Sequence, residues 1–179
     1  IWMKYQEAIV VMMNRIVGTP QDTSWLFASS SIRTMVPFSS LKKITRMFDA
    51  CHNLEVLKVS GWISASSYAF TNCNNLRVIQ GNLSLDTSGG SVNLKGAFAG
   101  CAKLEEVTIN NLYLDVSFAD CPLLSLASLS NMVAKAINTS TITITVHPDV
   151  YTKIVDESNA EWSALLDAAS QKQINFATV

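Results

Sequence analysis

The sequence has few charged residues and no long apolar run. Asp, Glu, Lys and Arg make up 15% of its 179 residues, and thirteen basic side chains against fourteen acidic ones leave a formal charge of -1. No field of one sign therefore draws the chain to nucleic acid or to an anionic membrane. The longest apolar stretch, Ala8 to Met13, is much shorter than the roughly 18 to 20 residues that span a bilayer, so we expect no membrane insertion. The hydrophobic share of 49% excludes disorder and predicts a single domain with a sizeable core.

The residue patterns that accompany catalysis or metal binding are also scarce. The four cysteines are 22, 28 and 20 residues apart without a CxxC pair, and two histidines, His52 and His147, are too few to complete a zinc site. Glu105 and Glu106 are adjacent in an expected strand, so they do not form the facing pair of a glycosidase. Gly89-Gly90 lacks the lysine of a phosphate-binding loop. The sequence therefore predicts no enzyme, no metal and no cofactor.

One phrase, F-x-x-C-x-x-L, occurs four times along the chain. Its copies are Phe48, Cys51, Leu54; Phe70, Cys73, Leu76; Phe98, Cys101, Leu104; and Phe118, Cys121, Leu124. A degraded copy begins at Phe27, with Ser30 in the cysteine position and Ile32 or Met35 as the aliphatic contact. The phenylalanines are thus 21, 22, 28 and 20 residues apart. A regular period of this length is typical of a solenoid, in which each repeat buries its faces against its neighbours.

Each repeat is expected to contribute one strand to a parallel sheet. Six and eight residues after each cysteine stand the positions whose spacing of two predicts an inward strand face. They are Leu57 and Val59, Ile79 and Gly81, Val107 and Ile109, and Ala127 and Leu129. The residues around them are expected to point outward and form a candidate partner-binding face: Glu55, Lys58, Arg77, Gln80, Glu105, Glu106 and Thr108.

The stretch before each phenylalanine is expected to complete the repeat with a second apolar contact. Ile44, Leu94 and Leu114 occupy that place, whereas the polar Ser66 holds it before Phe70. The longest interval between phenylalanines carries its excess around Asp86 to Ser91, which is a turn-forming run. This insertion is either a binding loop or an excursion that the fold tolerates.

The cysteines occupy the same position in every repeat, which favours a row of small apolar side chains buried in the core. A disulfide between neighbouring repeats is the alternative. His52 lies in a turn whose equivalents in other repeats are Asn74, Ala102 and Pro122, and this variety indicates a solvent-facing position. An enzymatic role would need a pocket lined together by His147, Asp149 and Tyr151.

The two ends of the chain are predicted to cap the repeats. Apolar residues from Trp2 to Ile16 recur at helical spacing up to Gly18 and Pro20. At the other end we expect a helix capped by Ser130 that runs through Met132, Val133 and Ile137. A strand over 142–146, ended by His147-Pro148, is expected next, followed by helices over 149–155 and 160–172 and a strand over 174–179. The second of these C-terminal helices is expected to bury Trp162, Leu165, Leu166 and Ala169. The domain plan is one solenoid: a helical cap over 1–20, repeats over 21–129 and an α/β cap over 130–179.

Ala97 to Ile109 reads A-F-x-x-C-x-x-L-x-x-V-x-I, which resembles the BspA-like leucine-rich repeats of bacterial surface proteins. The resemblance covers Phe27 to Leu129, and Met47, Ser117, Ser30 and Gly81 depart from the pattern. It implies a right-handed α/β solenoid with short parallel strands, and a secreted or cell-surface protein that binds a protein or glycan, with no catalytic residues to transfer.

The stretch 138–151 looks like the end module of such proteins in gut Bacteroides-type bacteria and in prophage-encoded tail proteins. The alternative role is therefore that of a structural or receptor-contacting module of a prophage tail or another large assembly. The partner and the oligomeric state are not encoded in any motif of the chain.

Overall fold

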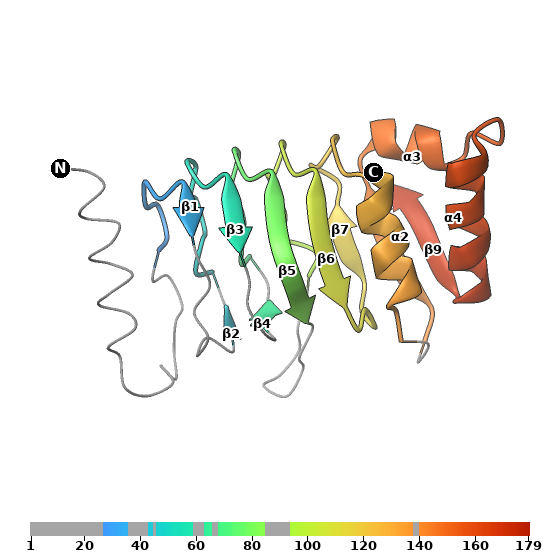
Figure 1. Cartoon of the computed structure of the whole chain (residues 1–179), viewed down its shortest axis with the longest axis horizontal. Coiled ribbons are helices and arrows are strands. Elements are labelled where there is room, and N and C mark those ends of the chain that lie inside the picture. The colour runs from blue at the N-terminus through green and yellow to red at the C-terminus, as the bar shows by residue number, and fades with distance from the viewer. Residues whose placement is uncertain are drawn as a thin grey trace.

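The computed structural model describes residues 27–35, 43–44, 46–58, 63–65, 68–84, 94–137 and 140–179. The predicted N-terminal helix, Ser66 and the predicted insertion loop at 86–91 lie outside these residues. Successive repeats follow one another along the long axis, and the C-terminal helices lie at the far end (Figure 1).

A six-stranded parallel sheet holds the repeats together. Its strands are β1 (Thr34–Met35), β2 (Lys43–Ile44), β3 (Val56–Lys58), β4 (Ile63–Ala65), β5 (Val78–Ser84) and β6 (Glu106–Asn110). The strands β1, β3, β5 and β6 lie side by side (Figure 1), with Val56 paired to Val78 and Val78 to Glu106. β2 pairs with β4, and β4 pairs with the end of β5. Each repeat therefore places its strand in register with the strand of the preceding repeat.

A second parallel sheet joins the repeats to the C-terminal segment. Its strands are β7 (Val116–Phe118), β8 (Ile142–Val146) and β9 (Ile174–Thr178). Leu94 forms a bridge with Val116, Val116 pairs with Ile144, and Ile144 pairs with Phe176. The stretches before Phe98 and Phe118 thus pair with each other, and β8 and β9 continue this pairing through their backbones. Val116 is the register partner of Leu94, so the assignment of Leu114 to this position was wrong: Leu114 precedes the strand and is only partly buried.

The phenylalanines of the repeats form a continuous stack in the core. The rings of Phe27, Phe48, Phe70, Phe98 and Phe118 follow one another with centroid distances of 5.7, 5.7, 5.6 and 4.8 Å. All five side chains are buried, with at most 7% of their surface exposed. Because each ring packs against the ring of the adjacent repeat, the fixed phase of phenylalanine in the sequence becomes one apolar column.

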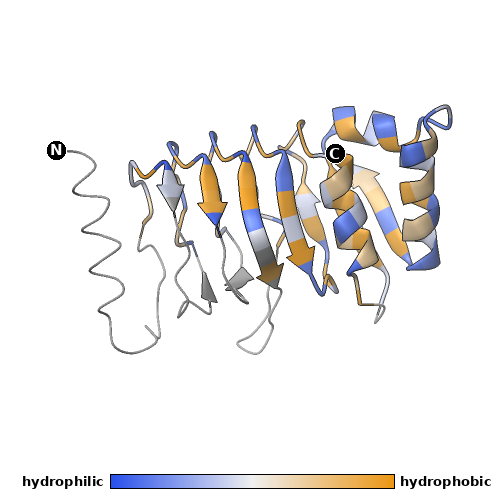
Figure 2. Ribbon diagram, in the orientation of Figure 1, coloured by the Kyte–Doolittle hydropathy of each residue, from blue (hydrophilic) through white to orange (hydrophobic). Residues whose placement is uncertain are grey.

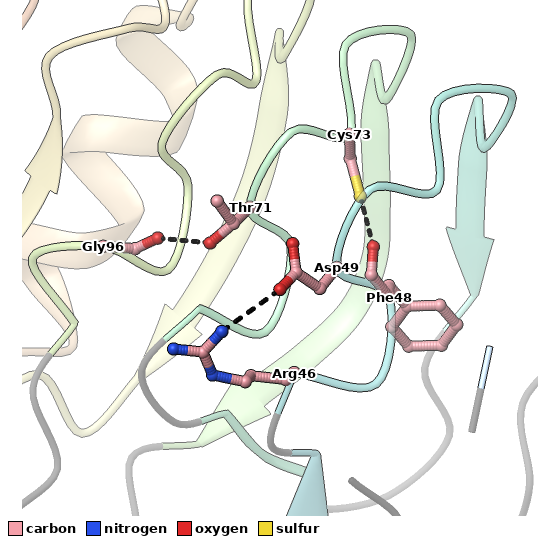
Figure 3. A network of polar contacts seen from close by, with 6 residues as sticks. All are labelled: Arg46, Phe48, Asp49, Thr71, Cys73 and Gly96. Carbon is pink, nitrogen blue, oxygen red and sulfur yellow. Dashed lines mark hydrogen bonds and ion pairs between the residues drawn. The ribbon is translucent and has the colours of Figure 1, made fainter. Parts of the chain in front are cut away.

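The cysteines form a second column, and each thiol donates to the backbone carbonyl of the phenylalanine one repeat earlier. The Sγ to oxygen distances are 2.8 Å for Cys51, 3.0 Å for Cys73, 3.1 Å for Cys101 and 3.8 Å for Cys121. Figure 3 shows the bond from Cys73 to Phe48. All four are free thiols in the core. Burial raises the pKa of every one, that of Cys121 to about 12. A small side chain that can both pack and donate explains why cysteine stands at this phase.

The degraded first copy is part of the same stack. Ser30 lies in the cysteine position, with its Oγ 3.6 Å from the Sγ of Cys51. Of the two aliphatic candidates, Ile32 packs against the core, and Met35 pairs with Leu57 in the sheet.

The fifth repeat contains a helix where a strand was predicted at Ala127 and Leu129. Helix α2 (Leu126–Ala134) begins after the N-cap residue Ser125, so the prediction of Ser130 as the cap was also wrong. Leu129, Met132 and Val133 are buried at helical spacing, whereas Ala127 is exposed. Leu129 fits both the strand phase and the helix phase, and the serine cap with the apolar stripe after it favours the helix.

The remaining C-terminal elements occur where they were expected. Helix α3 (Pro148–Ile154) follows β8, and α4 (Ala160–Gln171) precedes β9. α4 buries Leu165 and Ala169, but Leu166 is 41% exposed and the predicted burial of this residue was wrong. Ile137, which follows the end of α2, is likewise 43% exposed. Figure 2 shows polar and apolar residues alternating around α2 and α4, as expected of helices with one buried face.

Candidate partner-binding face

Four charged residues stand just before the strands of β1, β3, β5 and β6 and alternate in sign across the sheet: Arg33, Glu55, Arg77 and Glu105. Arg33 Nε lies 4.0 Å from Glu55 Oε1. Arg77 binds Glu105 in a bidentate manner, with Nε to Oε1 and Nη2 to Oε2 both 3.1 Å apart. This contact lowers the pKa of Glu105 and raises the pKa of Arg77. The two residues therefore compensate each other's charge within the chain.

The predicted outward residues of the strands are aligned by the sheet register. Lys58 of β3 pairs with Gln80 of β5. In β6, Val107 pairs with Ile79 of β5, and Thr108 follows Val107. Glu55, Lys58, Arg77, Gln80 and Glu106 are exposed, whereas Glu105 and Thr108 are partly buried. The intervening Leu57, Ile79 and Val107 are buried. The register thus brings Lys58, Gln80, Glu106 and Thr108 onto neighbouring strands, and the role of the predicted residues in binding stays a prediction.

A pocket of about 270 Å³ lies where this sheet meets α2. β5 and β6 contribute Ile79, Gln80, Gly81, Glu106, Val107 and Thr108, and the fifth repeat contributes Ser125, Ala127, Ser128 and Asn131. Gln80, Glu106 and Thr108 belong to the predicted face. The other polar lining residues, all in the fifth repeat, were missed because a strand was expected there. The sequence signal that could have revealed them is the serine cap followed by apolar residues at helical spacing.

Ser128 fixes the helical wall of this pocket against the sheet. Its Oγ accepts the Val107 N–H at 3.1 Å and donates to the Glu105 carbonyl at 3.4 Å. The Ser125 N–H adds a bond to the same carbonyl at 2.9 Å. Ser128 is 4% exposed. The hydroxyl thus replaces the next strand as the partner of the β6 edge, so α2 stands directly beside the sheet.

A bulge in β5 shapes the floor of the pocket. Ile79 pairs with Val107 and Leu83 with Ile109, so residues 80–82 lie opposite the single residue Thr108. Gly81 adopts a φ of 99°, a backbone conformation that favours glycine, and it is exposed. The predicted inward position of Gly81 was therefore wrong, and the buried Leu83 takes the core place instead.

The histidines serve local structure. His52 is exposed, and its Nδ1 lies 2.7 Å from Asn74 Oδ1 and 3.0 Å from the Asn72 carbonyl, which links two neighbouring turns. His147 is the N-cap of α3, and its Nδ1 accepts the Asp149 N–H at 3.1 Å. Tyr151 packs against the core. In the part of the chain that the structure describes, no group of three or more His, Cys, Asp or Glu residues could hold a metal ion.

Arg46, Asp49, Tyr68 and Gly96 form a separate polar contact on the surface. Arg46 Nη1 lies 3.4 Å from Asp49 Oδ2 (Figure 3). Arg46 Cζ lies 4.3 Å from the centre of the Tyr68 ring. A Cβ on Gly96 would lie 2.6 Å from Tyr68 Cε1, so the glycine leaves room for the ring. Thr71 Oγ1 donates to the Gly96 carbonyl at 2.9 Å. These contacts tie successive repeats together on the side of the phenylalanine turns.

Among known protein families, the BspA type leucine-rich repeat region matches residues 23–142 in six copies. No curated protein and no solved structure matches the chain. Leucine-rich repeats typically mediate protein binding and are generally non-enzymatic, and repeats of the BspA type are often found in surface-associated bacterial proteins. None of the described helices is long and apolar enough to cross a membrane. Because the match spans more than half of its length, the chain belongs to the BspA-type leucine-rich-repeat family.

Proposed function

We propose that the chain is a non-catalytic binding module that presents the β1-β3-β5-β6 face to a protein partner at a bacterial surface. In this proposal the chain is a right-handed solenoid capped by segments 1–20 and 130–179, and residues 21–129 supply the binding face. Adhesion to a host or neighbouring cell is the activity that such a face would serve. Family membership supports binding in general, and the arrangement of this chain's own residues supports the choice of face.

The observation that carries the proposal is the pocket between β5, β6 and α2. It lies on the predicted face and includes Gln80, Glu106 and Thr108. A flat sheet offers little shape for recognition, whereas a helix beside a sheet forms a step that excludes water from a bound side chain. The pocket therefore provides an anchoring point within a larger polar surface.

The character of the pocket favours a protein partner over a glycan. Its volume of about 270 Å³ is slightly below the range of about 300 to 1,000 Å³ for sites that enclose a small molecule. Among the described residues that line it, none is aromatic, so a sugar ring has no apolar face to stack on. A single side chain from a protein surface fits these properties better, and a glycan is the alternative that the experiment must separate.

The test blocks the face chemically. Because the four native thiols are buried, a cysteine introduced at Gln80 can be coupled selectively to a maleimide-linked polyethylene glycol. Glu157→Cys is the matched control, since Glu157 is exposed in the turn between α3 and α4, and these two helices lie at the far end of the molecule (Figure 1). Both labelled chains and the unlabelled wild type are used to select from a random peptide library displayed on phage, and are probed on a glycan array.

We expect the wild type and the labelled Glu157→Cys chain to enrich the same peptides, and the labelled Gln80→Cys chain to lose them. Enrichment that survives the label at position 80, or the absence of any enrichment, would contradict the proposed face. Binding to glycans that the same label abolishes would replace the protein partner by a carbohydrate.

A further inference from the structure

The pocket beside α2 carries one charge that none of the described residues neutralises by a direct contact. Glu106 is the only charged residue among the described residues that line it. The nearest cation of the face, Arg77, already binds both carboxylate oxygens of Glu105. Lys58 stands two strands away, on β3. The pocket therefore has negative character although the charges of the whole face nearly cancel.

The polar groups around Glu106 add hydrogen-bond acceptors. Asn131 Nδ2 donates to the Ala127 carbonyl at 2.9 Å, so its Oδ1 remains as the acceptor of that amide. Thr108 supplies a hydroxyl oxygen and Gln80 supplies a second amide. The Ser125 hydroxyl is already engaged as the N-cap of α2. A carboxylate surrounded by amide and hydroxyl oxygens is suited to a cation with several N–H donors.

The fixed position of α2, which forms one wall of the pocket, also suits a cation with several N–H donors. Ser128 holds α2 against β6 through two hydrogen bonds, so the wall is fixed before any partner arrives. Gly81 presents no side chain over the floor. A preformed pocket loses little conformational entropy on binding, and a long flexible side chain can enter it from above the sheet.

We propose that this pocket receives a basic side chain, arginine in preference to lysine, from the protein partner, with Glu106 as its counter-ion. The inference rests on the proposed function and names the chemistry of its central contact. Arginine is preferred because its planar guanidinium can bind the carboxylate in a bidentate manner and still donate to the neighbouring amide and hydroxyl oxygens. Lysine offers three donors around a point charge and matches this arrangement less well.

The test uses peptides selected on the wild-type chain from the random library. We expect a basic residue at one fixed position of the enriched sequences. Replacing an arginine at that position by citrulline, which has nearly the same shape and no charge, is expected to weaken binding at least about tenfold in a fluorescence polarisation titration, since a charge-assisted hydrogen bond is lost. Glu106→Gln is expected to weaken the arginine peptide to a similar degree and to leave the citrulline peptide nearly unchanged.

Two further variants make the test specific. Glu157→Gln removes an exposed carboxylate far from the pocket and is expected to bind the arginine peptide like the wild type. Glu106→Lys reverses the charge, and selection on this variant is expected to enrich acidic residues at the position that was basic. Urea unfolding checks that both Glu106 variants fold, as expected for an exposed side chain.

The outcomes separate the inference from the proposed function. Peptides that the label at position 80 blocks, but that lack a basic residue or bind the Glu106→Gln variant unchanged, overturn the basic-side-chain inference and leave the binding face standing. Peptides that bind elsewhere, or no peptides at all, overturn the proposed face and the inference together.

Discussion

The strongest test of the repeat architecture is Phe98→Ala in the middle of the phenylalanine stack. Phe98 is 1% exposed and lies between Phe70 and Phe118, with ring centroids 5.6 and 4.8 Å away. The substitution removes a buried aromatic side chain and leaves a cavity that adjacent repeats cannot close without moving their own rings. Comparable Phe→Ala changes in protein cores cost about 3 to 5 kcal/mol, and the two ring contacts place this position toward the upper part of that range.

Equilibrium urea denaturation of the whole chain, followed by circular dichroism, measures this loss. Leu123→Ala is a suitable control because Leu123 is 52% exposed and the change should stay within about 0.5 kcal/mol. A loss below about 1 kcal/mol for Phe98→Ala would refute the stacked phase of the phenylalanines.

A double-mutant cycle then tests whether the column acts through neighbouring rings. Phe70 and Phe98 are in contact, so their alanine substitutions should be non-additive by about 0.5 to 3 kcal/mol. Phe48 and Phe118 are separated by two rings of the stack, and their substitutions should add within about 0.5 kcal/mol. Equal coupling in both pairs would show that the measured loss comes from general unfolding of the stack and not from direct ring contact.

Three other perturbations probe separate parts of the structure by the same unfolding assay. Ser128→Ala leaves the buried Val107 N–H without its partner and should cost about 1 to 3 kcal/mol, whereas the exposed Ser130→Ala should be nearly neutral. Gly100→Ala should cost at least about 1 to 2 kcal/mol, because Gly100 has a φ of 72° and a Cβ there would lie 2.8 Å from Asn72 Oδ1. The buried thiols keep their protons in the folded chain, so their contribution to stability should be constant below the ordinary thiol pKa of about 8.5. Above that pH, stability should fall by about 1.4 kcal/mol per pH unit for each thiol. This fall ends as the pH passes the folded pKa, and Cys121→Ala, which removes one thiol with a folded pKa of about 12, should make it shallower by that amount.

The repeats could be predicted from the sequence because their side chains repeat with the structure. Phe, Cys and Leu stand at fixed offsets, and a residue that recurs in one phase of a solenoid meets its own copy in the next repeat. This reasoning located the cysteines in the core, and the same fixed phase brings the Phe98 ring beside Phe70 in the structure. It did not reveal that each thiol donates to a carbonyl, since backbone carbonyls carry no sequence signal.

The parts that escaped prediction are those where the repeat is broken. Leu129 satisfies the strand phase and the helix phase equally, and the strand was predicted from the phase of the earlier repeats although the serine cap and the apolar stripe after it favour the helix. Gly81 looked like a weakened core position, because a bulge changes which residue faces inward without changing the composition of the strand. The bulge depends on pairing between strands of different repeats, which a pattern local to one repeat cannot contain, whereas the helix had a local signal in its serine cap.

The two breaks in the repeat lie at the same place, and this explains why the pocket forms there. A parallel sheet that ends at β6 would expose a row of unpaired backbone groups, which favours pairing with other chains. The chain covers that edge with α2 through Ser128 instead of adding another strand. A helix is wider than a strand and stands above the sheet, so covering the edge necessarily creates a step against the outer face. The bulge at Gly81 lies in the adjoining strand and forms the floor of that step. The pocket is thus a direct consequence of how the sheet ends, and a variant that continued the sheet with a strand in place of α2 would keep the polar face and lose the anchoring site.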